Sequence, residues 1–226
     1  MTELINSPAH TEPPTARSTR TLWRVAGGLV VAHVVLLFAA LTLEVSTVHG
    51  DSPTKLQHVL ASANLDRVMA GGYAESVSFL LLAPAIVVVA ALLGRRTEVG
   101  RLAARTFLAL GVAYIASTLA VGFPPGAAAL YGAHHGVDGQ TLATVMDIRI
   151  YGFYLQVAIS CAMMLALGIA ALAERVLVKW AGWCGAALGA IGVLASPLAP
   201  NAFSMVWIVW FLGLGVLALR GGPREA

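Results

Sequence analysis

The chain has 226 residues, of which 58% are hydrophobic and only 11% charged, and its net charge is +3. A soluble domain is roughly one quarter charged, so this composition leaves too little polar surface to coat one and predicts an integral membrane protein. The basic residues lie in short segments between apolar runs rather than in a basic tail or a basic-aromatic array, which argues against a nucleic-acid partner.

Residues 1–20 are polar and rich in Pro, Thr and Ser, and we expect them to form a disordered cytoplasmic tail. Six apolar runs follow, and each is close to the ~20 residues that a helix needs to cross a bilayer. They are Leu22–Leu43, Ser76–Leu93, Ala103–Gly122, Ile148–Ala173, Val178–Ala195 and Ala202–Leu219. The sequence therefore predicts an all-α fold, a bundle of six transmembrane helices over residues 21–220, with a second cytoplasmic tail at 221–226.

The distribution of lysine and arginine predicts the orientation. Of the 14 such residues, only Lys55, Arg67 and Arg149 lie on the side opposite to the two termini. Because basic residues concentrate in cytoplasmic loops, both ends of the chain are expected in the cytoplasm of a multi-pass protein of the cell membrane.

Two long segments, residues 44–75 and 123–147, are expected on the outer side. In the first, Asp51-Ser52-Pro53 is a helix-start signal. The apolar residues after it recur with helical spacing, at Leu56, Val59, Leu60 and Ala63. We predict a short amphipathic helix over the outer mouth of the bundle. In the second segment, Asp138 is positioned to cap an extension of the fourth membrane helix.

Burial of an ionisable group at membrane depth costs free energy. We therefore expect His33, at the middle of the first run, to have a functional or packing role. Glu44 follows on nearly the same helical face, roughly 16 Å further along the axis. These two residues are expected either to line a ligand cavity or proton path, or to serve helix packing. In the second case a neutral His33 bonds to a neighbouring helix and Glu44 lies at the membrane interface.

The fourth run is polar on two faces, which indicates a central position in the bundle. One face carries Asp147, Tyr151, Tyr154 and Cys161, and the other carries Arg149, Gln156 and Ser160. The two tyrosines beneath Asp147 are expected to form a binding wall. Alternatively, Asp147 and Arg149 lie in water and the tyrosines belong to the aromatic belt at the membrane surface.

Glu75 at the entry of the second run and Tyr114 in the third complete the candidate ligand-binding set. The predicted members are His33, Glu44, Glu75, Tyr114, Asp147, Tyr151 and Tyr154. The outer half carries more acidic than basic residues, which favours a cation or a hydroxylated substrate. No cofactor motif occurs, so we predict no cofactor. The outer histidines lack the spacing of a zinc site, so we predict no metal site either. These histidines are His49, His58, His134 and His135.

Several short motifs give the layout a family likeness: Asn64-Leu65-Asp66-Arg67, Arg95-Arg96, Asp147 leading into Tyr151-Gly152-Phe153, and Lys179-Trp180-Ala181-Gly182-Trp183. In these, residues 20–220 resemble a bacterial family of six-helix membrane proteins described only as domain of unknown function 4386. The resemblance implies a fold and a bacterial plasma membrane, and it supplies no activity and no catalytic residues.

Three functions are compatible with this pattern. The first is a protein that binds or transports a lipophilic small molecule or cation in a polar cavity toward the outer leaflet. The second is a membrane-embedded enzyme, a cyclase or isomerase whose proton donor is Glu44, Glu75 or Asp147. The third is a structural or accessory subunit. Membrane lipid is an expected partner in each case, and a six-helix transporter without internal repeats would need to form a homodimer.

Overall fold

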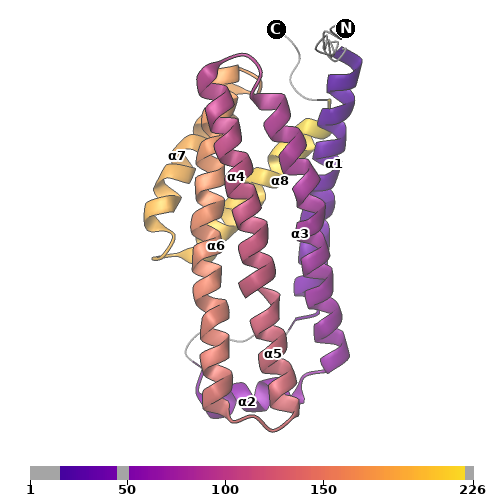
Figure 1. The fold of residues 1–226 in the computed structure, drawn as a ribbon, viewed down its shortest axis with the longest axis vertical. Helices are drawn as coiled ribbons and strands as arrows, with labels where there is room; N and C mark the ends of the chain where they lie inside the picture. The colour runs from indigo at the N-terminus through magenta and orange to yellow at the C-terminus, as the bar shows by residue number, and fades with distance from the viewer. Residues whose placement is uncertain (1–15, 45–50, 222–226) are drawn as a thin grey trace, which may run out of the picture.

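The computed structural model describes residues 16–44 and 51–221, and this part of the chain is helical and contains no strand (Figure 1). The helices are α1 (Ala16–Leu41), α2 (Pro53–Ser62), α3 (Leu65–Leu93), α4 (Glu98–Val121), α5 (Phe123–His134), α6 (Gly139–Glu174), α7 (Lys179–Ala195) and α8 (Pro200–Leu219). The all-α prediction is confirmed. Residues 16–20, the last part of the predicted N-terminal tail, are helical, whereas residues 1–15 and 222–226 of the predicted tails lie outside the described residues.

Five helical segments are long and apolar enough to cross a membrane: α1, α3, α4 with α5, α6 and α8. The sixth predicted span corresponds to α7, which is apolar but has only 17 residues. At 1.5 Å per residue it is about 26 Å long, slightly less than the ~30 Å of a typical hydrocarbon core. The structure therefore supports five or six membrane-spanning helices.

The helix-start signals that the sequence predicts in the two long loops are the N-cap residues of α2 and α6. The Ser52 side chain accepts a hydrogen bond from the Lys55 backbone N–H at the start of α2, and Pro53 occupies the first turn. Leu56 and Leu60 are buried, which confirms the short amphipathic helix. The Asp138 carboxylate accepts hydrogen bonds from the backbone N–H groups of Gln140 and Thr141 and caps α6 as expected.

Helix α6 has 36 residues and is about 54 Å long, far more than a membrane crossing requires. Its first turns pack with α2 and α5 at the end of the molecule away from the described chain ends (Figure 1). This region, which we call the distal cap, has its own apolar core, formed by Leu56, Leu60, Ala129, Leu130, Ala133, Leu142 and Met146. The opposite end, where α1 begins and α8 ends, is called the terminal end.

The remaining helices pack around a larger core that extends toward the terminal end. Helix α1 contacts α3 and α8, while α6 contacts α4 and α7. Small residues bring α6 and α7 together, since a side chain at Gly189 would collide with the backbone of Leu165. The turn after α1 brings Glu44 to Arg149, in the first third of α6, where the distal cap meets the bundle.

Candidate functional site

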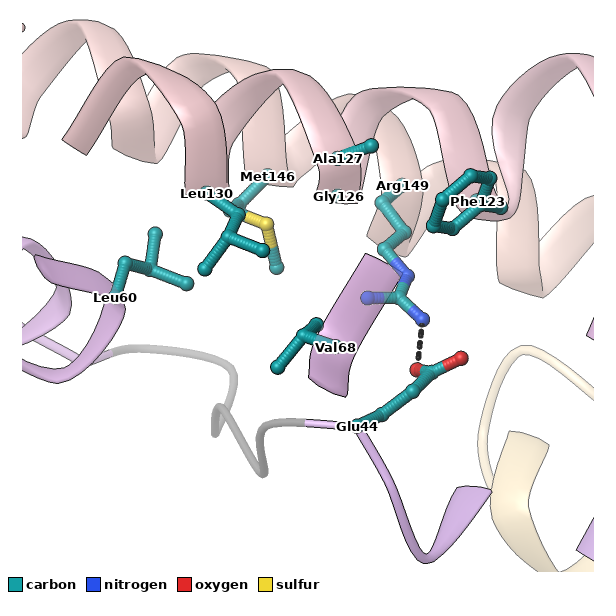
Figure 2. Close-up of a pocket in the computed structure, with 9 residues that line it drawn as sticks. All are labelled: Glu44, Leu60, Val68, Phe123, Gly126, Ala127, Leu130, Met146 and Arg149. Atoms are coloured by element: carbon teal, nitrogen blue, oxygen red, sulfur yellow. Dashed lines mark hydrogen bonds and ion pairs between the residues drawn. The ribbon is translucent and has the colours of Figure 1, made fainter. Parts of the chain in front are cut away.

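An ion pair joins α1 to α6 at the boundary between the distal cap and the bundle. The Arg149 guanidinium donates through Nη2 to Glu44 Oε2 over 2.6 Å (Figure 2). The Glu44 side chain is only 10% exposed and that of Arg149 28% exposed. Both charges are therefore largely removed from solvent. Each charged group then depends on the other for stabilisation, because loss of one would leave the other buried without a counter-charge.

A second carboxyl group lies beside this pair. Glu75, on α3, interacts with Glu44 and is within electrostatic range of Arg149. Glu44 Oε1 and Glu75 Oε2 are both buried and receive no hydrogen bond from any other described residue, and a proton shared between the two carboxyl groups would join them. Arg67, at the same end of α3, is exposed and donates to the Thr42 carbonyl instead. With both acids ionised, the three central side chains carry a net charge of −1.

Glycines create the space for these long side chains. A β-carbon at Gly126, on α5, would lie 2.7 Å from Arg149 Nη1. At Gly71, on α3, it would lie 2.9 Å from the Leu43 β-carbon and 3.5 Å from Glu44 Cγ. Gly126 and Gly71 therefore allow α5 and α3 to lie close to the side chains of Arg149 and Glu44.

A cavity opens beside the ion pair. Glu44 and Arg149 line it on the polar side, and residues of α2, α3 and α5 form the apolar walls (Figure 2). The space that a water-sized sphere can occupy in it is about 20 Å³, and its empty volume is about 360 Å³ with the open mouth included. A buried water needs roughly 10–15 Å³, so the cavity has room for a water molecule or a small ion.

Two further polar side chains continue the site into the bundle. The buried Gln156 Nε2 has no hydrogen-bond partner among the described residues, and Gln156 lies about 10 Å further along α6 than Arg149, on the same face. Tyr114, on α4, is buried, and its phenol group is close enough to Glu75 to feel the charge of that carboxyl group. Buried polar groups without protein partners are positions where an ion or water is expected.

His33 lies deeper and serves helix packing. Its Nδ1 is 2.9 Å from the Ser78 carbonyl oxygen, so this nitrogen carries the proton and donates. The ring packs edge-on against Phe79, at a centroid distance of 5.0 Å, and Phe79 packs in the same way against Tyr114. This is the geometry expected for a neutral histidine that bonds to a neighbouring helix.

The structure separates two predicted site residues from the others. Asp147 and Tyr151 are exposed, the latter by 72%. Tyr154 is half-buried and contacts Tyr151 edge-on at 6.3 Å. The binding wall of these three residues stays a prediction, whereas Arg149, predicted on the other face of α6, is the residue that reaches Glu44.

The outer histidines have local roles where they are described. The His134 side chain bonds to the Ala63 carbonyl, and His135 bonds to the Tyr131 carbonyl and stacks on its ring. His49 lies outside the described residues. Within the described ranges, no group of three or more His, Cys, Asp or Glu side chains could hold a metal ion.

Comparison of the chain with protein-family models, with curated proteins and with solved structures finds no match. The family resemblance noted in the sequence therefore stays a prediction. Any functional assignment depends on the site itself, which consists of Glu44, Glu75 and Arg149 with Gln156 and Tyr114 behind them.

Proposed function

We propose that this chain is a six-span protein of the bacterial plasma membrane, with both ends in the cytoplasm, that binds a small monovalent cation in the cavity beside Glu44. A proton competes with the cation for the same carboxyl groups. The observation that carries this proposal is the pair of buried, unpartnered carboxyl oxygens, Glu44 Oε1 and Glu75 Oε2, beside a single guanidinium.

The charge balance favours uptake of one positive charge. Two carboxylates and one guanidinium sum to −1, and in a medium of low dielectric constant an uncompensated charge is expensive. One bound cation, or one proton on a carboxyl group, removes that cost. Carboxylate oxygens are also ligands that hard cations prefer.

The lining of the cavity favours a small cation over a lipophilic molecule. The Glu44 carboxylate and the Arg149 guanidinium form one side of it, and a lipophilic substrate would have to lie against both charged groups. The geometry thus gives less support to the enzyme alternative. A purely structural role requires the carboxyl groups of Glu44 and Glu75 to share a proton, since neither oxygen receives a hydrogen bond from another described residue.

Equilibrium binding of radioactive sodium and rubidium to the purified protein in lipid nanodiscs tests the proposal. The wild-type protein should bind one ion at mildly alkaline pH, and acidification should displace it. Glu75→Gln should abolish binding, while Glu98→Gln, which changes an exposed acid at the terminal end, should leave it unchanged. Absence of saturable binding to the wild type, or equal binding by Glu75→Gln, would contradict the proposal.

A further inference from the structure

A second cavity lies near the terminal end and is entirely apolar. Residues of α1, α3, α6 and α8 line it, together with Leu177 from the loop after α6. Trp23, Val30, Leu93 and Phe211 are among its walls. The enclosed part has a volume of about 20 Å³, and about 360 Å³ with the open mouth included. An open apolar groove of this kind suits a flexible hydrocarbon chain better than a compact ligand.

Basic side chains surround this end of the groove. Arg20 and Arg24 lie on α1, one turn apart and next to Trp23, and both are exposed. Arg220 follows the last turn of α8, and the Arg20 side chain lies over the backbone of Gly221 beside it. The α1 and α8 arginines therefore gather at one corner.

Among the residues that the structure describes, these positive charges have no acidic partner. Within residues 16–44 and 51–221, neither Arg20, Arg24 nor Arg220 forms an ion pair. The carboxylate of Glu174 at this end is buried and bonds to backbone N–H groups of the loop before α4. The corner thus combines uncompensated positive charge with an apolar groove, which is complementary to an anionic headgroup on a hydrocarbon chain.

We propose that an anionic phospholipid binds at this corner, with one acyl chain in the groove between α1 and α8 and its phosphate against Arg20, Arg24 and Arg220. This inference is independent of the cation site, which lies at the other end of α1. The tryptophan at the groove, Trp23, is of the residue type that favours the level of lipid headgroups.

Native mass spectrometry of the detergent-purified protein, titrated with phosphatidylglycerol or phosphatidylcholine, tests the headgroup contacts. One phosphatidylglycerol should remain bound preferentially. The double variant Arg20→Gln/Arg24→Gln should bind it roughly 30-fold more weakly, since each basic side chain near an anionic lipid contributes several-fold. The matched control is Arg101→Gln/Arg105→Gln, which removes an equally spaced exposed pair from α4 and should retain the affinity. Equal losses in both double variants would indicate diffuse attraction and overturn the site.

A second pair of variants tests the groove. Leu214→Phe adds volume at a lining position and should weaken phosphatidylglycerol binding several-fold, whereas Val216→Phe, on the exposed side of α8, should not. Circular dichroism and thermal unfolding establish that each variant is folded. Unchanged binding by Leu214→Phe, or complete displacement of the lipid by inorganic phosphate, would overturn the assignment of the acyl chain to this groove.

Discussion

The guanidinium of Arg149 lies 2.6 Å from the carboxylate of Glu44, and this contact joins the first third of α6 to the turn that follows α1. Glu75 reaches the same point from α3. Three helices that are distant in the sequence thus place two acids and one base in a largely buried position. The arrangement has one acid more than the guanidinium neutralises, and the unpartnered carboxyl oxygens identify where the additional positive charge is expected.

The Glu44–Arg149 pair should contribute measurably to stability. Arg149→Gln should lower the free energy of unfolding by about 2 kcal/mol, because it leaves two largely buried acids without the guanidinium. Glu44→Gln should cost less, because Glu75 remains beside Arg149. The double variant should lose less than the sum of the two single losses, by about 1–2 kcal/mol. Unfolding in mixed detergent micelles measures all three.

The exposed Asp51–Lys55 pair provides the control for this cycle. It has the same 2.6 Å separation, but the Lys55 side chain is 61% exposed. Lys55→Gln should therefore change stability by less than about 0.5 kcal/mol. Strictly additive losses for Glu44→Gln and Arg149→Gln would show that the central pair is not energetically coupled.

Gly126 should be required for the position of Arg149. In Gly126→Ala the new β-carbon meets Nη1 of Arg149, and moving the side chain should cost about 1–3 kcal/mol. Gly213→Ala is the matched control on α8, where a β-carbon meets nothing within 4 Å, and it should be neutral or stabilise by about 0.5–1 kcal/mol. Thermal unfolding compares the two variants; a stability gain in both would contradict this account of Gly126.

Glu174 should hold the loop between α3 and α4 in place. Its carboxylate accepts the backbone N–H groups of Arg96 and Thr97, each at 2.8 Å, and the residue is 1% exposed. Glu174→Gln replaces an acceptor oxygen by a donor and should lower the free energy of unfolding by about 1.5–3 kcal/mol. Hydrogen exchange at the first turn of α4 should accelerate as well. A loss no larger than that of the exposed Glu98→Gln would disprove this role.

The proposed orientation can be tested by cysteine labelling. After replacement of Cys161 and Cys184 by serine, Ala61→Cys places a thiol on the exposed side of α2 in the distal cap. An impermeant maleimide should label it in intact cells. Arg101→Cys, at the terminal end, should react only after the membrane is permeabilised. The reverse pattern would place the chain ends outside.

Much of the fold could be predicted because its signals are local. Apolar runs of sufficient length predict membrane helices, and Ser52 and Asp138 mark helix starts through their side-chain acceptors. The number of spans is less certain from such patterns. Helix α7 is close to the minimum length, and its contacts with α6 rather than its composition determine how it lies.

The site was predicted in part. Glu44, Glu75 and Tyr114 were expected near one another; the side chain of Glu75 interacts with that of Glu44 and lies near Tyr114. Which face of α6 meets Glu44 was not predictable, since both of its faces are polar and helical periodicity cannot distinguish them. In the structure that face carries Arg149, which packs against Gly126. The one available signal was the charge of Arg149, an isolated base at the level of several acids.

A cation between the carboxyl groups of Glu44 and Glu75 can be located by a crystal structure of the wild-type protein in rubidium, through the anomalous scattering of the ion. We expect a single strong anomalous peak within coordination distance of Glu44 Oε1 and Glu75 Oε2, absent from crystals of Glu75→Gln. A site that contains only an ordered water or no density in rubidium would contradict it, and the three side chains would then be a structural contact between helices.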